Sequence, residues 1–407
     1  MTARARRHAA ALACAAAAAC APGGEAPARD AAPAADSVAA FDPSRDYFPD
    51  KARVRRSTQF AVEYHGHYKV LTVTPRKAPH RRERYALVRR GTPAPPGFDA
   101  RHVIPVPVRR FVLTHRDYRS SVVLLGVDDR LAGLDRFRTV TLPALRRRID
   151  AGAVQEIGAQ EHLDVERVLA LAPDVVLNYW SVADAYNVGP KLAELGVRSV
   201  GLVAHWEEHP VASAEWLKAV ALFFDREAEA ERLFDAIEAR YERVAAGARA
   251  APARPMVLSG RPGRDAWGVL RPDIYLRREF VDAGGDYFWP VPPDSATFPS
   301  VPLEAVLERA RDAPVWVRAP DGVRSVDDLV ARDARLALFT AVRRGEVYAF
   351  DRGRTPAGGN PYDERWVTEP DVVLADMVAV IHPELARGRP LVFARRLDPP
   401  AGGAAAP

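Results

Sequence analysis

The sequence predicts an α/β protein with two Rossmann-like lobes, each built on a parallel sheet, joined by one long helix and preceded by a small β-rich N-terminal extension. Three observations support this fold. From Arg110 onward, short apolar runs alternate with helical patterns, which is typical of parallel sheets covered on both faces. A long helical pattern at Arg226–Ala248 divides the alternation into two series, and before Arg110 the pattern is that of strands alone.

The start of the chain has the features of a secretory signal. Basic Arg4, Arg6 and Arg7 precede an apolar run over residues 9–19 that is too short to span a bilayer. Small residues stand directly before Cys20, which favours cleavage there and acylation of this cysteine, with simple cleavage nearby as the alternative. We therefore expect residues 1–20 to be a lipoprotein signal peptide. The mature protein would be exported and lipid-anchored, at the periplasmic face or the cell surface.

The cysteine usage and composition limit what the rest of the chain can be. The only other cysteine, Cys14, also lies in the signal, so the folded body has no thiol, disulfide or cysteine metal site. Residues 21–40 are rich in Ala, Pro and Gly and are expected to form a flexible tether. The net charge of +5 comes from arginines spread along the chain, and no nucleic-acid-binding module is present, so we expect no nucleic-acid partner.

The apolar patterns assign the remaining elements in order. Residues 41–108 form the β-rich extension, with a hairpin over Phe60–Val73 and strands at Tyr85–Val88 and Val103–Val108. The first lobe covers residues 109–225, with strands at Phe111–Leu113, Leu131–Leu134, Val175–Leu177 and Val197–Val203 and helices at Tyr118–Leu125, Val165–Leu171, Val188–Leu195 and Ala214–Phe224. The linker helix covers residues 226–249. The second lobe covers residues 250–390, with strands at Met256–Leu258, Val315–Val317 and Val347–Phe350, and residues 391–407 are expected to be a disordered tail.

A set of short motifs accompanies this pattern. They are Leu125–Gly133, Ile157–Gly158, Leu163–Asp174, Leu192–Gly196, Gly284–Gly285 and Pro302–Leu307. In order and spacing, the chain from about Arg110 to Leu385 resembles the periplasmic solute-binding proteins of iron-siderophore and cobalamin ABC importers, in a long branch with an N-terminal extension. The resemblance implies no catalysis, and the sequence has no G-x-S-x-G, P-loop, G-x-G-x-x-G after a strand or HExxH motif that would indicate an enzyme.

The resemblance also implies a docking role for two glutamates. In this family a glutamate at the start of a surface helix on each lobe pairs with arginines of the permease dimer, and the matching positions are Glu166 and Glu304. Each precedes an apolar helical stretch, which places it in an exposed first turn where a fixed negative charge could steer docking. The alternative is a glutamate that only complements a helix N-terminus.

The ligand site is expected where loops follow the carboxyl ends of the strands, because ligands of two-lobed α/β proteins bind in that crevice. Aromatic, histidine and arginine residues are concentrated in these loops. The candidate ligand-binding residues are His115, Tyr118, Tyr179, Trp180, His205 and Trp206 in the first lobe and Arg261, Trp267, Tyr287, Trp289, Arg352, Arg354, Tyr362 and Trp366 in the second.

These residue types suit a small metal chelate. Flat aromatic faces can contact a catechol, hydroxamate or macrocycle, while arginines neutralise the negative charge of a ferric chelate. We expect no cofactor of the protein's own and an Fe(III) chelate as ligand. The alternatives are a binder of haem or cobalamin, a structural lipoprotein, and capture of bare Zn or Mn by His115, His205 and His209 beside Glu207 and Glu208.

Overall fold

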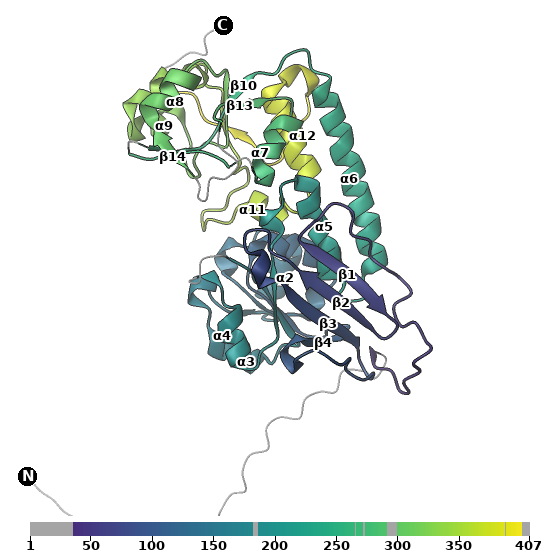
Figure 1. Cartoon of the computed structure of the whole chain (residues 1–407). Coiled ribbons are helices and arrows are strands. Elements are labelled where there is room, and N and C mark those ends of the chain that lie inside the picture. Colours follow the sequence, from purple (N-terminus) through teal and green to yellow (C-terminus); the bar gives the residue numbers. More distant parts are fainter. Residues whose placement is uncertain are drawn as a thin grey trace, which may run out of the picture. The chain divides into compact units, whose positions relative to one another are not determined.

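The computed structural model describes residues 36–400 except 182–185, 265, 272, 291–298 and 387. The predicted signal peptide with Cys20, most of the predicted tether, and residues 401–407 lie outside the described residues and stay predictions. The described chain has the predicted fold of two α/β lobes joined by a long helix (Figure 1). Among the described helices, none combines the length and the apolar character that crossing a membrane would need.

The first lobe is built on a five-stranded, fully parallel sheet with the order β7-β6-β5-β8-β9. Its strands are β5 (Phe111–Leu113), β6 (Leu131–Leu134), β7 (Gln155–Glu156), β8 (Val175–Tyr179) and β9 (Ser199–Leu202). Its helices are α1 (Arg119–Leu124), α2 (Pro143–Asp150), α3 (Val165–Leu171) and α4 (Gly189–Glu194). Asp164 caps α3 by accepting a hydrogen bond from the Arg167 backbone N–H at 2.9 Å.

The extension forms a separate sheet with the order β1-β2-β3-β4. The strands are β1 (Phe60–His65), β2 (Tyr68–Val73), β3 (Glu83–Arg89) and β4 (Val103–Val106), with β4 parallel to β3 and the other pairs antiparallel. Its apolar side chains join the main core instead of forming one of their own, and Phe60 packs against Trp216 with ring centroids 4.9 Å apart. The extension is therefore part of the folded body.

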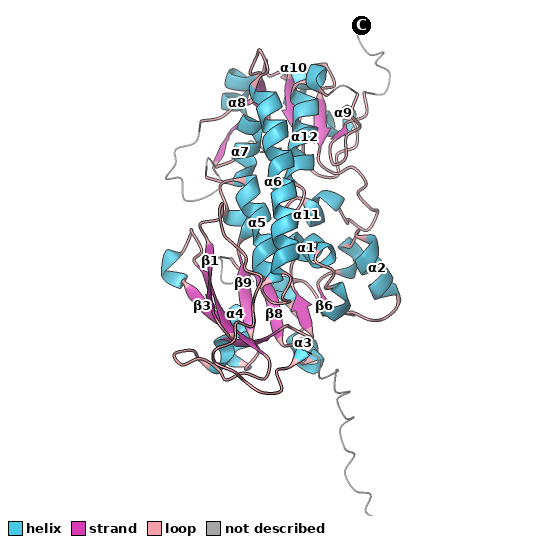
Figure 2. Cartoon of the chain, turned by 90° about the vertical axis from the view of Figure 1, so that its right-hand side faces the viewer, coloured by secondary structure: helices cyan, strands magenta, loops and turns pink. Residues whose placement is uncertain are grey.

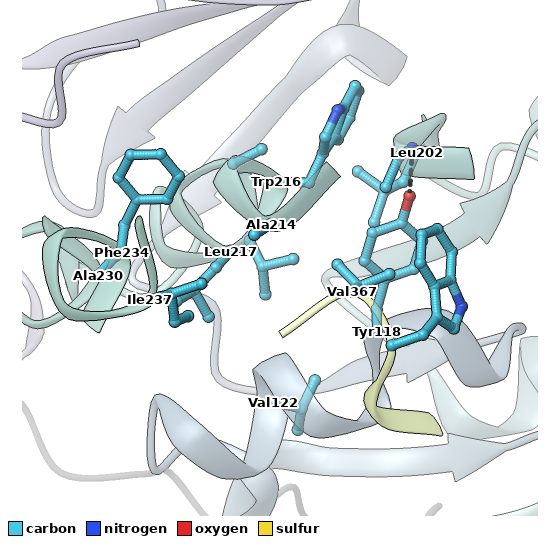
Figure 3. Packing of buried hydrophobic residues seen from close by; sticks show 14 of the residues in the cluster. Tyr118, Val122, Leu202, Ala214, Trp216, Leu217, Ala230, Phe234, Ile237 and Val367 are labelled. Carbon is cyan, nitrogen blue, oxygen red and sulfur yellow. Dashed lines mark hydrogen bonds between the residues drawn. The ribbon is translucent and has the colours of Figure 1, made fainter. Parts of the chain in front are cut away.

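Two central helices carry the packing between the parts of the chain. Helix α5 (Pro210–Ala221) is buried along its whole length, and α6 (Glu227–Arg249) lies along it and along α12 (Pro370–Ile381) (Figure 2). Figure 3 shows Phe234 and Ile237 of α6 beside Leu217 of α5, with Tyr118 and Val122 from the first lobe nearby. The apolar face of α6 packs against helices of both lobes, so α6 connects the lobes as a rigid element.

The second lobe has a five-stranded sheet with the order β13-β10-β15-β16-β17, in which only β17 is antiparallel, and a three-stranded sheet β11-β12-β14. Its strands are β10 (Met256–Leu258), β11 (Arg261–Pro262), β12 (Ala266–Gly268), β13 (Asp286–Tyr287), β14 (Ser300–Pro302), β15 (Val315–Val317), β16 (Val347–Ala349) and β17 (Arg395–Arg396). The remaining helices are α7 (Tyr275–Asp282), α8 (Leu303–Ala310), α9 (Val326–Arg332), α10 (Thr340–Arg343) and α11 (Pro361–Arg365).

The structure corrects the predicted disordered tail over residues 391–407. Strand β17 pairs with β16, and Phe393 and Leu397 are buried. The carboxylate of the buried Asp376 accepts hydrogen bonds from the backbone N–H groups of Val392, Phe393 and Ala394. The segment up to residue 398 is thus part of the second lobe.

The extension is held to the core by a buried carboxylate on α5. Glu215 is fully buried and accepts hydrogen bonds of 2.7 Å from the backbone N–H groups of Arg55, Arg56 and Ser57. It also pairs with the fully buried Lys218 at 3.1 Å. Three N–H donors and one ammonium group compensate the burial of this charge.

Replacing Glu215 by alanine is therefore expected to lower the free energy of unfolding by about 3 kcal/mol, because the donors and the Lys218 charge lose a buried partner. Denaturant unfolding followed by circular dichroism measures this. The matched control is Glu308→Ala on the exposed side of α8, which should change stability by less than about 0.5 kcal/mol. Equal stability of the two variants would contradict the anchoring role.

Candidate ligand-binding site

On the first lobe, three aromatic rings stack at the carboxyl ends of the strands. His115 follows β5, Tyr179 ends β8, and His205 follows β9. The Tyr179 ring lies between the two imidazoles, with centroids 4.3 Å from His115 and 4.1 Å from His205. Trp206 meets His205 edge-on at 5.3 Å. Because parallel strands end at one sheet edge, residues far apart in sequence form one aromatic surface.

His205 is held without a hydrogen bond. The residue is partly exposed, but both ring nitrogens are buried and have no hydrogen-bond partner among the described residues. Burial lowers the pKa of His205 to about 3, a shift that the nearby Asp117 carboxylate opposes. The imidazole is therefore neutral at physiological pH.

On the second lobe, a pocket of about 470 Å³ opens at the carboxyl ends of β10, β15 and β16. Its aromatic walls are Tyr275, Phe350 and Tyr362. The residues that line it also include Ser259, Gly260, Arg261, Val269, Leu270, Leu276, Arg318, Ala319, Asp321, Asn360 and Asp363. A mostly apolar cavity with a few polar groups is the usual form of a small-molecule site.

Arg318 is the cationic group that is fixed against the aromatic walls of this pocket. It directly follows β15 with a φ of +62°, a conformation that non-glycine residues rarely adopt. Its guanidinium bonds the Tyr362 hydroxyl at 2.8 Å and the buried Glu279 carboxylate at 2.5 Å. Its central carbon lies 4.5 Å from the centre of the Phe350 ring. The positive charge is thus fixed in place against two aromatic walls.

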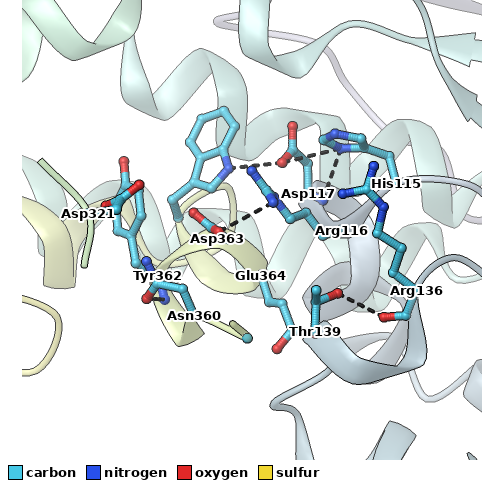
Figure 4. Close-up of polar contacts among 12 residues, drawn as sticks. His115, Arg116, Asp117, Arg136, Thr139, Asp321, Asn360, Tyr362, Asp363 and Glu364 are labelled. Carbon is cyan, nitrogen blue, oxygen red and sulfur yellow. Dashed lines mark hydrogen bonds and ion pairs between the residues drawn. The ribbon is translucent and has the colours of Figure 1, made fainter. Parts of the chain in front are cut away.

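The two lobes meet beside this pocket, at α11 and the 3-10 helix η4 (Arg116–Tyr118). Arg116 pairs with Asp363 at 3.4 Å (Figure 4). The Trp366 indole donates to the Asp117 carboxylate at 3.2 Å. Burial raises the pKa of Asp363, while Arg116 acts in the opposite direction. These groups place the aromatic stack of the first lobe and the pocket of the second lobe on either side of one junction.

Behind this junction lies a buried ionic bridge. Arg119 of α1, whose side chain has no exposed surface, bonds Asp135 and the Glu364 carboxylate of α11 at 2.8 Å each. Glu364 also accepts hydrogen bonds from the backbone N–H of Thr141 at 2.8 Å and from the hydroxyl of the same residue. The bridge joins elements almost 250 residues apart in the chain and fixes α11 against the first lobe.

The structure brings part of the predicted ligand set to the junction. His115, Tyr179, His205 and Trp206 lie at the first-lobe strand ends, and Arg261 and Tyr362 line the second-lobe pocket. Trp366 is nearly buried and stacks on Tyr275 at 4.2 Å, behind the pocket wall. Arg352 and Arg354 are exposed on the loop after β16, outside the pocket lining. Tyr287 and Trp289 are partly buried and also lie outside the pocket lining.

Three predicted ligand residues have other roles, which corrects the prediction. Tyr118 and Trp267 have no exposed surface, because their polar atoms bond the backbone of Ala204 and Ser259 and their rings fill the core. Trp180 is buried, meets Trp206 edge-on at 4.9 Å and lines a separate pocket beside the extension. An aromatic residue after a strand can point to either face of the sheet, and the pattern did not tell which.

The histidines expected for bare metal capture do not converge. His209 caps α5 by accepting from the Val211 N–H, and its other nitrogen lies 3.6 Å from Asp282. Glu207 is buried and accepts from the Trp216 indole, while Glu208 pairs with Arg76. Over the described ranges, no group of three or more His, Cys, Asp or Glu side chains is arranged to hold a metal ion.

The reasoning from sequence missed Arg318, although the rule it used would have found it. Arg318 is the first residue after a predicted strand. His115 and Trp206 were predicted as ligand residues because they too lie shortly after predicted strands. Arg119 and Glu364 carried no comparable signal, because their pairing depends on the packing of α1 against α11.

Glu166 and Glu304 lie in the first turns of α3 and α8, as expected, and both are exposed. Glu304 bonds Arg335 at 2.5 Å.

Fold and junction together define a two-lobed ligand-binding protein of the periplasmic type. The model of one family, the periplasmic binding proteins, matches residues 112–352, which is more than half of the chain. The chain belongs to this family. The match does not separate the iron-siderophore and cobalamin branch from the others, and that finer assignment stays a prediction.

Solved structures with this fold and one curated protein are also similar to the chain. A periplasmic binding protein of Veillonella parvula superposes with a TM-score of 0.56 at 13% identity, over 83% of this chain and 100% of that one. A possible iron-binding periplasmic solute-binding protein of Staphylococcus epidermidis gives 0.53 at 16% identity, over 68% and 99%. An uncharacterized lipoprotein of Methanocaldococcus jannaschii is 24% identical over 252 residues, 61% of this chain and 58% of that protein.

The buried His205 predicts a pH dependence of stability. Between its folded pKa of about 3 and the ordinary value of 6.5, the unfolded chain binds a proton that the folded chain does not. Stability therefore falls as the pH drops through this range, by about 2 kcal/mol between pH 7.5 and about pH 5 from this group alone.

In His205→Phe, the loss of unfolding free energy between these two pH values should be smaller than in the wild type by this amount. Denaturant titrations at both pH values measure it. His162→Phe, at an exposed histidine, should leave the wild-type pH dependence in place. An unchanged pH dependence in His205→Phe would show that this imidazole is not buried neutral.

Proposed function

We propose that this protein captures a small ferric chelate outside the inner membrane and hands it to the permease of an ABC importer. The observation that carries the proposal is the second-lobe pocket of about 470 Å³, with Arg318 fixed between aromatic walls. The role is binding and delivery, without catalysis.

The chemistry of the junction supports a compact planar or aromatic chelate. Tyr362 and Phe350 offer ring faces on one lobe, and the Tyr179 stack offers them on the other. The first lobe contributes the positive charge of Arg116 to the junction. Arg138, also from the first lobe, donates a hydrogen bond to the backbone carbonyl of Ala357 in the second lobe at 3.0 Å. A ligand held here would lose most of its contact with water, which is how such sites obtain affinity.

Haem is the second candidate. The partly exposed His115 next to Tyr179 would offer an imidazole and a phenol at the junction, side chains that serve as axial ligands of haem iron. A periplasmic haem-binding protein of Pseudomonas aeruginosa has the same fold, with a TM-score of 0.50 at 21% identity over 68% of this chain and 93% of that one.

Isothermal titration of a form beginning after Cys20 against ferric catecholates, ferric hydroxamates, haem, cobalamin and Zn should give one-to-one binding of one ferric chelate. In Tyr362→Ala, its affinity should fall about tenfold or more, because an aromatic wall of the pocket is removed. Haem binding alone would replace the chelate as ligand, and no binding across the series would contradict the proposal.

Tyr348→Ala is the matched control for this experiment. Tyr348 is a partly buried tyrosine on β16 of the same lobe, and it bonds Glu346 away from the pocket. Its loss should change the affinity by less than about twofold. Equal effects of the two substitutions would place the ligand elsewhere.

The two exposed glutamates support a docking role at the permease. Replacing both Glu166 and Glu304 by arginine should abolish uptake of the radiolabelled chelate and leave its affinity unchanged, because the charges that steer docking lie away from the pocket. Uptake by cells and titration of the purified protein measure the two effects. Glu194→Arg with Glu308→Arg, also exposed and one on each lobe, is the control and should retain uptake.

A further inference from the structure

A second pocket, of about 610 Å³, lies between the extension and the first lobe. It is bounded by β3 and the segment 97–102 on one side and by β8, β9 and α4 on the other, elements that lie together in Figure 2. The extension contributes Arg82 and Arg84 to its lining, and the first lobe contributes Asn178, Trp180 and Asn187. No residue is shared with the pocket at the lobe junction.

The walls carry an excess of positive charge. Four arginines line the pocket against two carboxylates, and both carboxylates have partners: Glu83 bonds the Tyr85 hydroxyl, and Asp99 pairs with Arg101 at 3.4 Å. Arg82 and Arg84 are exposed and have no carboxylate partner in the described part of the chain. The pocket therefore favours an anion.

The floor has unused hydrogen-bond acceptors. Asn178 on β8 is only 2% exposed, and its side-chain oxygen is buried without a hydrogen-bond partner among the described residues. The side-chain oxygen of Asn187, in the same lining, is also buried without one. An unpaired buried amide oxygen costs stability, so two in one cavity indicate a ligand that donates to them.

Trp180 closes the inner wall. Its side chain lies against Gly201, where a Cβ atom would come within 2.9 Å of it, and the Arg81 guanidinium lies 5.9 Å from the centre of its ring. This wall gives the pocket an apolar face beside its cationic rim.

From this arrangement we infer that the pocket is a second binding site, independent of the proposed function, for a small organic anion that carries hydroxyl groups beside a phosphate or carboxylate. The acid group would meet Arg82 and Arg84, and the hydroxyls would donate to Asn178 and Asn187. Such a group occurs both in free polyol phosphates and hydroxy acids and in the headgroup of phosphatidylglycerol.

The test is titration of glycerol 3-phosphate, citrate and sulfate into the protein, together with flotation on phosphatidylglycerol vesicles. Glycerol 3-phosphate or citrate should bind one-to-one, and more tightly than sulfate, which has no proton to donate. Arg82→Glu with Arg84→Glu should weaken this binding about tenfold or more. Arg243→Glu, at an exposed arginine of α6, should change it less than about twofold.

A further variant tests the donor contact separately. Asn178→Leu should remove the preference over sulfate while retaining sulfate binding. Vesicle binding that is lost in Arg82→Glu with Arg84→Glu, without binding of the free probes, would assign the site to the lipid headgroup. If neither the free probes nor the vesicles bind, or if Arg243→Glu weakens binding as much as Arg82→Glu with Arg84→Glu does, the inference is overturned.

Discussion

The arrangement of the two lobes depends on one buried charge. Arg119 has no exposed surface, so its guanidinium must be paired, and the structure pairs it with Asp135 from its own lobe and Glu364 from the other. Removing either carboxylate would leave the buried guanidinium with one carboxylate in place of two. This requirement holds α11 against α1, and α11 in turn carries Tyr362 and Asp363 to the pocket.

The contacts around this bridge differ greatly in strength, and the difference limits how the lobes can move. The Arg116–Asp363 pair has an arginine side chain 44% exposed, and exposed pairs contribute at most about 1 kcal/mol. Breaking the buried Arg119–Glu364 pair costs several kcal/mol. The packing of α6 along α5 and α12 is a second constraint on movement of the lobes. We therefore expect ligand entry to break only exposed contacts such as the Arg116–Asp363 pair and to leave the Arg119–Glu364 pair intact.

The sequence predicted the central strands of both lobes and the linker helix, because each of these depends on local signals. Buried parallel strands appear as short apolar runs, and Asp164 marks the start of α3. The failures depend on contacts between distant segments. Tyr118 follows β5 and Trp267 lies on β12, but both side chains are held in the core by hydrogen bonds with Ala204 and Ser259. The end of the chain is rich in Pro, Gly and Ala, yet Asp376 orders residues 392–394 through backbone hydrogen bonds.

The same distinction explains why the extension could be predicted as β-rich but not as part of the core. Its strands have local signals, whereas its attachment depends on Glu215 and on Lys69, which is fully buried and pairs with Glu227 at 2.7 Å. Buried ion pairs are costly to form and specify one arrangement over others. A sheet that served only to cover β9 could dock through apolar contacts alone. The ionic attachment fixes the position of β3 against the first lobe, so that Arg82 and Arg84 line the same pocket as Asn178.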